Sequence, residues 1–270
     1  MNRSIRLLSL LLVLILAACG ERPNALPSSG LAEGMFRDTL HVSDLEGGTN
    51  IRESGDYLMS LPAGLIQITS GAEIQDSILV FAVHGYASEG YEWITSIIEL
   101  SHHFGTCYFY RYDWERCPDE VATELVSAIN ALSISAQPGT RILLFAHSYG
   151  GVVGAFAASQ LSTGIPAELH LIAAPLAGYP RLMDACDDLR YDNQDRLVIP
   201  AWDSRIHVLQ HRTVHAQDGA FRDLAVDPQV VNLPFHEIIS LPPTMDGHRL
   251  GHNWSVSWVV DNYLGKPHGF

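Results

Sequence analysis

Short apolar runs alternate with helical patterns along most of this chain. A short continuous apolar run is typical of a strand that is covered on both faces, as in a parallel sheet. The stretch from Leu65 to Thr69 alternates instead, which predicts a half-buried strand. The continuous runs are Ile78 to Val83, Cys107 to Tyr112, Ile142 to Ala146, Leu169 to Ala173 and Ile206 to Leu209.

Apolar residues at three- and four-residue spacing lie between these runs and predict helices. Strands that alternate with helices favour a mostly parallel sheet with helices on both faces. The sequence therefore predicts one α/β domain over residues 35–270. The helical patterns begin near Trp93, Pro118, Val152 and Val256.

One long segment, Gly178 to Ser204, has no such pattern and contains six aspartates and two prolines. It follows the strand that ends near Ala173. We expect it to form a small cap over the carboxyl edge of the sheet, where folds of this kind build their sites.

The N-terminus has the features of an export signal. Arg3 and Arg6 precede an apolar run from Leu7 to Ala18, which is too short to cross a hydrocarbon core that needs about 20 helical residues. The run ends in the letters LAACG, which resemble the lipobox of bacterial lipoproteins and predict acylation of Cys19. An ordinary signal peptide with a chance cysteine is the alternative.

These features divide the part of the chain that precedes the predicted domain into two segments. We expect a signal peptide over residues 1–18 and a flexible tether over residues 19–34, which is rich in Pro, Ser and Gly. The mature protein would then lie in the cell envelope, held to a bacterial membrane by its lipid and facing the periplasm or the exterior.

Charge and histidine spacing limit the other partners. The chain has 30 acidic and 16 basic residues, a net charge of -14, which disfavours binding to nucleic acid. His211 and His215 are four apart, but this spacing at a strand end does not bring two imidazoles together. We expect a small-molecule substrate, with no metal and no cofactor.

A serine directly follows one of the buried runs. The strand ending at Ala146 continues into the letters HSYGG and then into a small-residue helix. A sharp turn from strand to helix needs small residues two positions from the central Ser148, and Ala146 and Gly150 supply them. The usual motif begins with glycine, so Ala146 departs from it by a methyl group. The pattern predicts that Ser148 is a nucleophile, the alternative being a plain Ser-Gly turn.

This elbow resembles that of the α/β-hydrolase family, in its lipase and esterase branch, over roughly Ile78 to Leu264. A second similar motif is the His84-Gly85-Tyr86 sequence at the end of a buried strand. The resemblance implies an α/β-hydrolase fold and an oxyanion hole made by the backbone N–H groups of Tyr86 and Tyr149. We expect His84 to be a structural residue.

A serine nucleophile needs a histidine base, and the base needs an acid that fixes its tautomer. In the family the acid follows the serine and the histidine comes last. His252 immediately precedes the last helix and is preferred over His248 and His236. Asp218, at a tight Asp-Gly turn after the last apolar run, is the preferred acid, with Asp223 as the alternative.

The resemblance therefore implies a serine esterase or lipase that works through an acyl-enzyme. Acyl transfer to an alcohol, or cleavage of a thioester or an amide, would use the same residues. A different kind of function is the alternative: a non-catalytic scaffold that binds a partner at the cell surface.

Three cysteines remain if Cys19 is lipidated. Cys107 lies at the amino end of its strand, whereas Cys117 and Cys186 both belong to the carboxyl edge of the sheet. Because a bridge needs Cα atoms within about 7 Å, we expect a disulfide between Cys117 and Cys186 and a buried free thiol at Cys107. A local bridge from Cys107 to Cys117 is the alternative.

Overall fold

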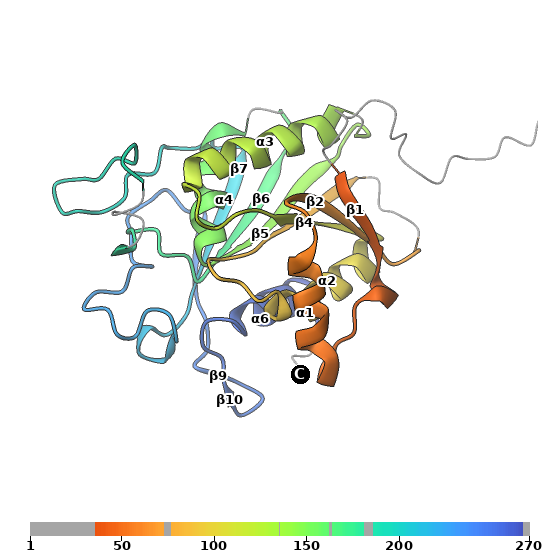
Figure 1. Ribbon diagram of the computed structural model, residues 1–270. Helices are drawn as coiled ribbons and strands as arrows, with labels where there is room; N and C mark the ends of the chain where they lie inside the picture. The colour runs from red at the N-terminus through yellow and green to blue at the C-terminus, as the bar shows by residue number, and fades with distance from the viewer. Residues whose placement is uncertain (1–35, 73–76, 135, 162–163, 181–185, 267–270) are drawn as a thin grey trace, which may run out of the picture. The chain divides into compact units, whose positions relative to one another are not determined.

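The computed structural model describes residues 36–72, 77–134, 136–161, 164–180 and 186–266 (Figure 1). The predicted signal peptide, the predicted lipidation site Cys19 and the predicted tether lie outside the described residues. In the part that is described, no helix combines the length and the apolar character needed to span a bilayer.

The core of the domain is an eight-stranded sheet with the order β1-β2-β4-β3-β5-β6-β7-β8. β1 and β2 run parallel to each other and antiparallel to the remaining strands, which are mutually parallel. The predicted mostly parallel sheet is therefore confirmed. Its strands are β1 (Phe36–His41), β2 (Gly64–Thr69), β3 (Ile78–Val83), β4 (Thr106–Arg111), β5 (Arg141–His147), β6 (Ala167–Ile172), β7 (Ile206–Arg212) and β8 (Glu237–Ser240).

Helices cover both faces of this sheet, as Figure 1 shows. Alternate residues of a strand point to opposite faces, so Leu144 of β5 joins one apolar cluster and Phe145 the other. α3 (Pro118–Ile134) and α4 (Tyr149–Gln160) cover the first cluster. α1 (Ile51–Ser60), α2 (Tyr91–Phe104) and α6 (Ser255–Tyr263) cover the second.

Two outer strands and one helix were not predicted. β1 and β8 lie at the two edges of the sheet, and β8 is largely exposed, so it carries no continuous apolar run. α1 contains Gly55, a residue that weakens helices. A Cβ at Gly55 would lie 2.5 Å from the Tyr91 nitrogen, so the close approach of α2 requires this glycine.

The long connection between β6 and β7 is tied to the rest of the domain by a disulfide. Cys186 in this connection bonds Cys117, which immediately precedes α3, with Cα atoms 5.7 Å apart. This is the predicted pair, and Cys107 in β4 is a buried free thiol, as predicted. The disulfide brings the connection to the edge of the sheet at which β5 ends and α4 begins.

Candidate active site

Ser148 lies in the sharp turn between β5 and α4. Its backbone has φ 55° and ψ −123°, a conformation that is strained for a residue other than glycine. The turn is possible because Gly150 has no side chain: a Cβ there would lie 2.2 Å from the carbonyl oxygen of His84. The predicted elbow is thus present, with Ser148 between a buried strand and a buried helix.

The loop after β3 lies against this serine. A Cβ added to Gly85 would be 2.8 Å from the Ser148 Cβ, so only glycine allows this approach. Tyr86, a predicted oxyanion donor, follows in the same loop. Tyr149, the other, is the first residue of α4, where a backbone N–H has no acceptor within its own helix. The N-terminus of α4 also favours negative charge at this point.

His84 is a structural residue, as expected. It is fully buried, and its Nδ1 lies 2.8 Å from the Gly85 carbonyl oxygen, to which it donates. Its Nε2 accepts from the Tyr112 N–H at 3.2 Å. Both ring nitrogens are used in the neutral form, and burial lowers the pKa of His84 to about 4. The ring therefore fixes the loop that carries Gly85 and Tyr86.

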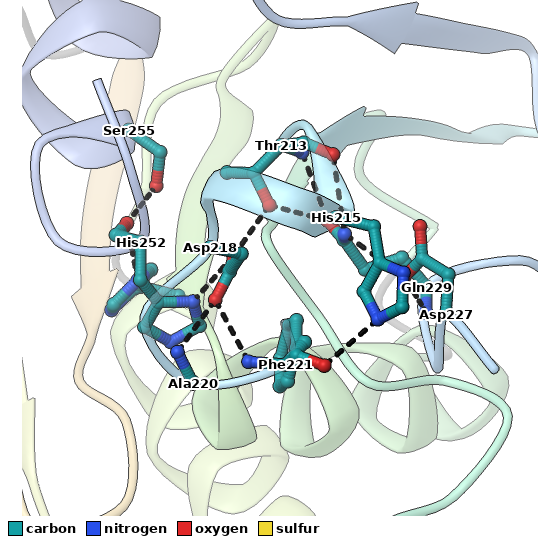
Figure 2. A network of polar contacts seen from close by, with 10 residues as sticks. Thr213, His215, Asp218, Ala220, Phe221, Asp227, Gln229, His252 and Ser255 are labelled. Carbon is teal, nitrogen blue, oxygen red and sulfur yellow. Dashed lines mark hydrogen bonds and ion pairs between the residues drawn. The ribbon is translucent and has the colours of Figure 1, made fainter. Parts of the chain in front are cut away.

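Asp218 and His252 form a hydrogen-bonded pair (Figure 2). Asp218 follows β7 and is fully buried, and its Oδ2 lies 2.9 Å from Nδ1 of His252, which precedes α6. The two residues are 34 positions apart in the chain. With Nδ1 donating to the carboxylate, Nε2 of His252 is left as the basic nitrogen. This is the arrangement that orients a histidine base.

Asp218 accepts hydrogen bonds at both of its oxygens. Its Oδ1 accepts from the backbone N–H groups of Ala220 at 2.8 Å and Phe221 at 3.2 Å. Its Oδ2 accepts from the Thr213 hydroxyl as well as from His252. Burial by itself would raise the pKa of Asp218, but these hydrogen bonds outweigh it and hold that pKa below its ordinary value. The carboxylate is therefore kept ionised in a buried position.

Two residues that the sequence analysis did not single out hold this carboxylate in place. Thr213 immediately follows β7, and its backbone N–H donates to Gln229 Oε1 at 2.9 Å. Gln229 is fully buried and its Nε2 donates to the Thr213 carbonyl at 3.3 Å. A buried glutamine in a loop gives no local sequence signal, because its partners come from a distant segment.

The alternative acid and bases lie outside this network. The Asp223 side chain is 90% exposed and faces Arg222 at 3.8 Å. His248 is exposed in the short strand β10 (His248–Arg249), which pairs with β9 (Thr244–Met245). His236 is exposed and its ring stacks on that of His207. In the described ranges, no three His, Cys, Asp or Glu side chains group in a way that could hold a metal ion.

Two cavities adjoin Ser148 and His252, and they differ in character. The first, which we call the apolar cavity, has a volume of about 150 Å³ and a mostly apolar lining that includes the aromatic side chains of Trp114, Tyr149, Tyr179 and Phe221. The second, the polar cavity, has a volume of about 180 Å³. Its polar lining includes Ser88, Glu92, His147 and Asn253.

Comparisons with known proteins by sequence gave one family match. A family model described as alpha/beta hydrolase matches residues 114–181, which include the elbow. Among curated proteins, none matches this chain by sequence.

Three solved structures illustrate what the fold is similar to. Est1E from Butyrivibrio proteoclasticus is 13% identical, with a TM-score of 0.49 over 73% of this chain and 90% of that chain. XC6422 from Xanthomonas campestris, an α/β serine hydrolase without a lid, is 17% identical, with a TM-score of 0.47 over 77% and 93%. LpqC, a poly(3-hydroxybutyrate) depolymerase from Bordetella parapertussis, is 13% identical, with a TM-score of 0.46 over 76% and 85%.

The mostly parallel sheet, the helices on both faces and the serine elbow at the end of β5 are those of the α/β-hydrolase fold.

Proposed function

We propose that this protein is a serine hydrolase that cleaves carboxylic esters through an acyl-enzyme. The observation that carries the proposal is the hydrogen bond of 2.9 Å between buried Asp218 and His252, beside the strained elbow of Ser148. His252 and Ser148 line the same two cavities, so substrate in either cavity meets both side chains.

The first half of the reaction acylates the serine. Ser148 Oγ attacks the ester carbonyl carbon while His252 Nε2 takes the hydroxyl proton. Negative charge develops on the carbonyl oxygen, which the N–H groups of Tyr86 and Tyr149 stabilise. The bond from carbon to the alcohol oxygen then breaks, and His252 returns the proton to the departing alcohol.

The second half repeats these steps with water. His252 takes a proton from water, whose oxygen attacks the acyl carbon. The bond to Ser148 Oγ breaks and the serine regains its proton, which releases the carboxylic acid. Asp218 stays ionised throughout and stabilises the imidazolium that forms twice in each turnover.

The test is covalent labelling combined with substitution. A fluorophosphonate should label the protein, and peptide mapping should place the adduct on Ser148. Ser148→Ala should abolish labelling and lower kcat/KM for a nitrophenyl ester by about 10³-fold or more. Ser204→Ala, at an exposed turn before β7, is the matched control and should behave like the wild type. A wild type that neither labels nor turns over esters would favour a binding scaffold instead.

We also propose that Cys19 anchors the mature protein to a bacterial membrane by acylation. The support comes from the sequence alone: two arginines, a short apolar run and small residues before the cysteine. Cys19→Ser should abolish incorporation of labelled palmitate and move the protein from the detergent phase to the aqueous phase. Retention of that variant in the detergent phase would mean that another feature holds it to the membrane.

A further inference from the structure

The polar cavity contains a buried acid that the proposed mechanism does not use. Glu92, near the start of α2, is 4% exposed and lines this cavity beside Ser148 and His252. Its Oε1 accepts a hydrogen bond from the Ser88 hydroxyl, which itself accepts from the Gly90 N–H at 3.1 Å. Its Oε2 has no hydrogen-bond partner among the described residues. A buried carboxyl oxygen without a partner is costly, which indicates that something else satisfies it.

A second residue that lines this cavity also has a buried polar atom without a partner in the described ranges. His147 is 2% exposed, and its Nε2 donates to the His252 carbonyl oxygen at 3.2 Å. With the proton on Nε2, Nδ1 is an acceptor, and it too has no partner in the part of the chain that the structure describes. Burial and the neighbouring His252 both lower the pKa of His147 well below its ordinary value, so the ring is neutral.

The charge state of this lining favours an uncharged polar ligand. Burial raises the pKa of Glu92, against the opposing hydrogen bond from Ser88, so its carboxyl is protonated more readily than usual. Glu89 at the same cavity is exposed and already pairs with Arg52 at 2.9 Å. A hydroxyl both donates and accepts, and it requires no ionisation of Glu92. An ammonium group would require that ionisation in a buried place.

We propose that the polar cavity binds a hydroxyl-bearing part of the ester, on one side of the bond that Ser148 attacks, while the apolar cavity binds the other part. Glu92 and His147 are the residues that select this hydroxyl. The inference rests on the proposed ester hydrolysis and adds a substrate class to it: short esters with a hydroxyl group close to the ester bond.

The test compares esters that differ only by a hydroxyl in place of a methyl. Hydroxyethyl butyrate against propyl butyrate places the hydroxyl in the alcohol part. Ethyl lactate against ethyl isobutyrate places it in the acid part. The wild type should prefer the hydroxylated member of one pair by about tenfold in kcat/KM, the value of a well-made hydrogen bond. The pair that shows the preference identifies the side of the ester that enters the polar cavity.

Substitutions at Glu92 test whether the polar cavity causes the preference for hydroxylated esters. Glu92→Met keeps the length of the side chain without its oxygens, and it should reduce the preference about tenfold. Glu92→Gln keeps a polar end and should retain most of the preference. Glu53→Gln, an exposed acid of α1, is the matched control. Because each ratio is compared between variants, differences in intrinsic reactivity between the esters cancel.

The outcomes separate this inference from the proposed function. A wild type that hydrolyses all four esters without preference overturns the inference and leaves ester hydrolysis intact, and this holds even if Glu92→Met does not fold. An equal preference in the wild type and Glu92→Met overturns it too. A preference for butyrylcholine over its uncharged dimethylbutyl analogue would overturn the choice of a hydroxyl. Absence of all turnover and of Ser148 labelling would overturn both.

Discussion

The loop after β7 and the start of α2 each place a buried carboxyl group near His252, and the two differ in their hydrogen bonding. Asp218 accepts from four donors at its two oxygens. Glu92 accepts from Ser88 at one oxygen, and the other has no partner in the described ranges. The pKa of Asp218 is accordingly lowered, whereas burial raises that of Glu92. Burial alone therefore does not set the protonation state of a carboxyl group. The number of hydrogen-bond donors around it matters as well.

This difference in hydrogen bonding suits the two carboxyl groups to different roles. An ionised carboxylate with every position occupied is suited to hold and stabilise one permanent partner, which is His252. A carboxyl group that lines a cavity and has one oxygen without a partner among the described residues is suited to bind a ligand.

The largest expected effect is on the Asp218 side. Asp218→Asn should lower kcat for a nitrophenyl ester by about 10⁴-fold, because the amide favours the wrong tautomer of His252 and cannot stabilise its charged form. Asp223→Asn, five positions along the chain and exposed, is the matched control and should be near the wild type. If Asp223→Asn loses activity and Asp218→Asn keeps it, the assignment of the acid is wrong.

A smaller effect is expected from Thr213, which contacts Asp218 but lines neither of the two cavities. Thr213→Val removes one donor to Oδ2 and should lower kcat by about ten- to hundredfold with little change in KM. Thr213→Ser keeps the hydroxyl and should restore most of the rate. A rise in KM at unchanged kcat would place Thr213 in substrate binding instead. Circular dichroism of both variants controls for folding.

The smallest effect is on stability, and its sign should differ between the two sides. Folding lowers the pKa of Asp218, so its ionised carboxylate stabilises the folded protein at pH values above the ordinary pKa of the group. This stabilisation is lost as the pH falls through the pKa of the folded state. Folding raises the pKa of Glu92, so its protonated carboxyl stabilises the folded protein at pH values below the ordinary pKa of the group. This stabilisation is lost as the pH rises through the pKa of the folded state.

Urea unfolding from about pH 3 to about pH 7 measures this difference. Relative to the wild type, Asp218→Asn should become less stable as the pH rises, whereas Glu92→Gln should become more stable. Exposed Asp223→Asn should show no such trend. Parallel slopes for the two buried variants would contradict the contrast between the sites.

Much of the proposed catalytic centre was predictable because its signals are local. The elbow from Ala146 to Gly150 is a contiguous stretch, and the close approach of the His84 carbonyl requires the glycine two positions after the serine. The Asp-Gly turn and the position of His252 before the last helix are local features too. The choice of Asp218 over Asp223 rested on that turn, and the structure places only Asp218 in contact with His252 among the two.

Other parts of the fold had sequence patterns that were misleading or weak. Gly55 interrupts the helical pattern of α1, yet the contact with α2 requires it. β8 is exposed at the sheet edge and so needs no apolar run. The residue type at Gly55 is set by a neighbour that is distant in sequence. The residue types in β8 are set by its exposed position at the edge of the sheet.

By itself, the sequence determined the α/β alternation, the serine elbow and the cysteines that pair, because each depends on residues close together or on the ends of strands. Only the tertiary structure decided which polar groups meet. Thr213 and Gln229 are joined across 16 positions, and Glu92 resembles an ordinary acidic residue in the first turn of a helix. What distinguishes Glu92 is that folding buries it at a cavity, with one oxygen that has no hydrogen-bond partner among the residues described. Hydrogen-bond partners supplied by distant segments leave no periodic trace in the chain.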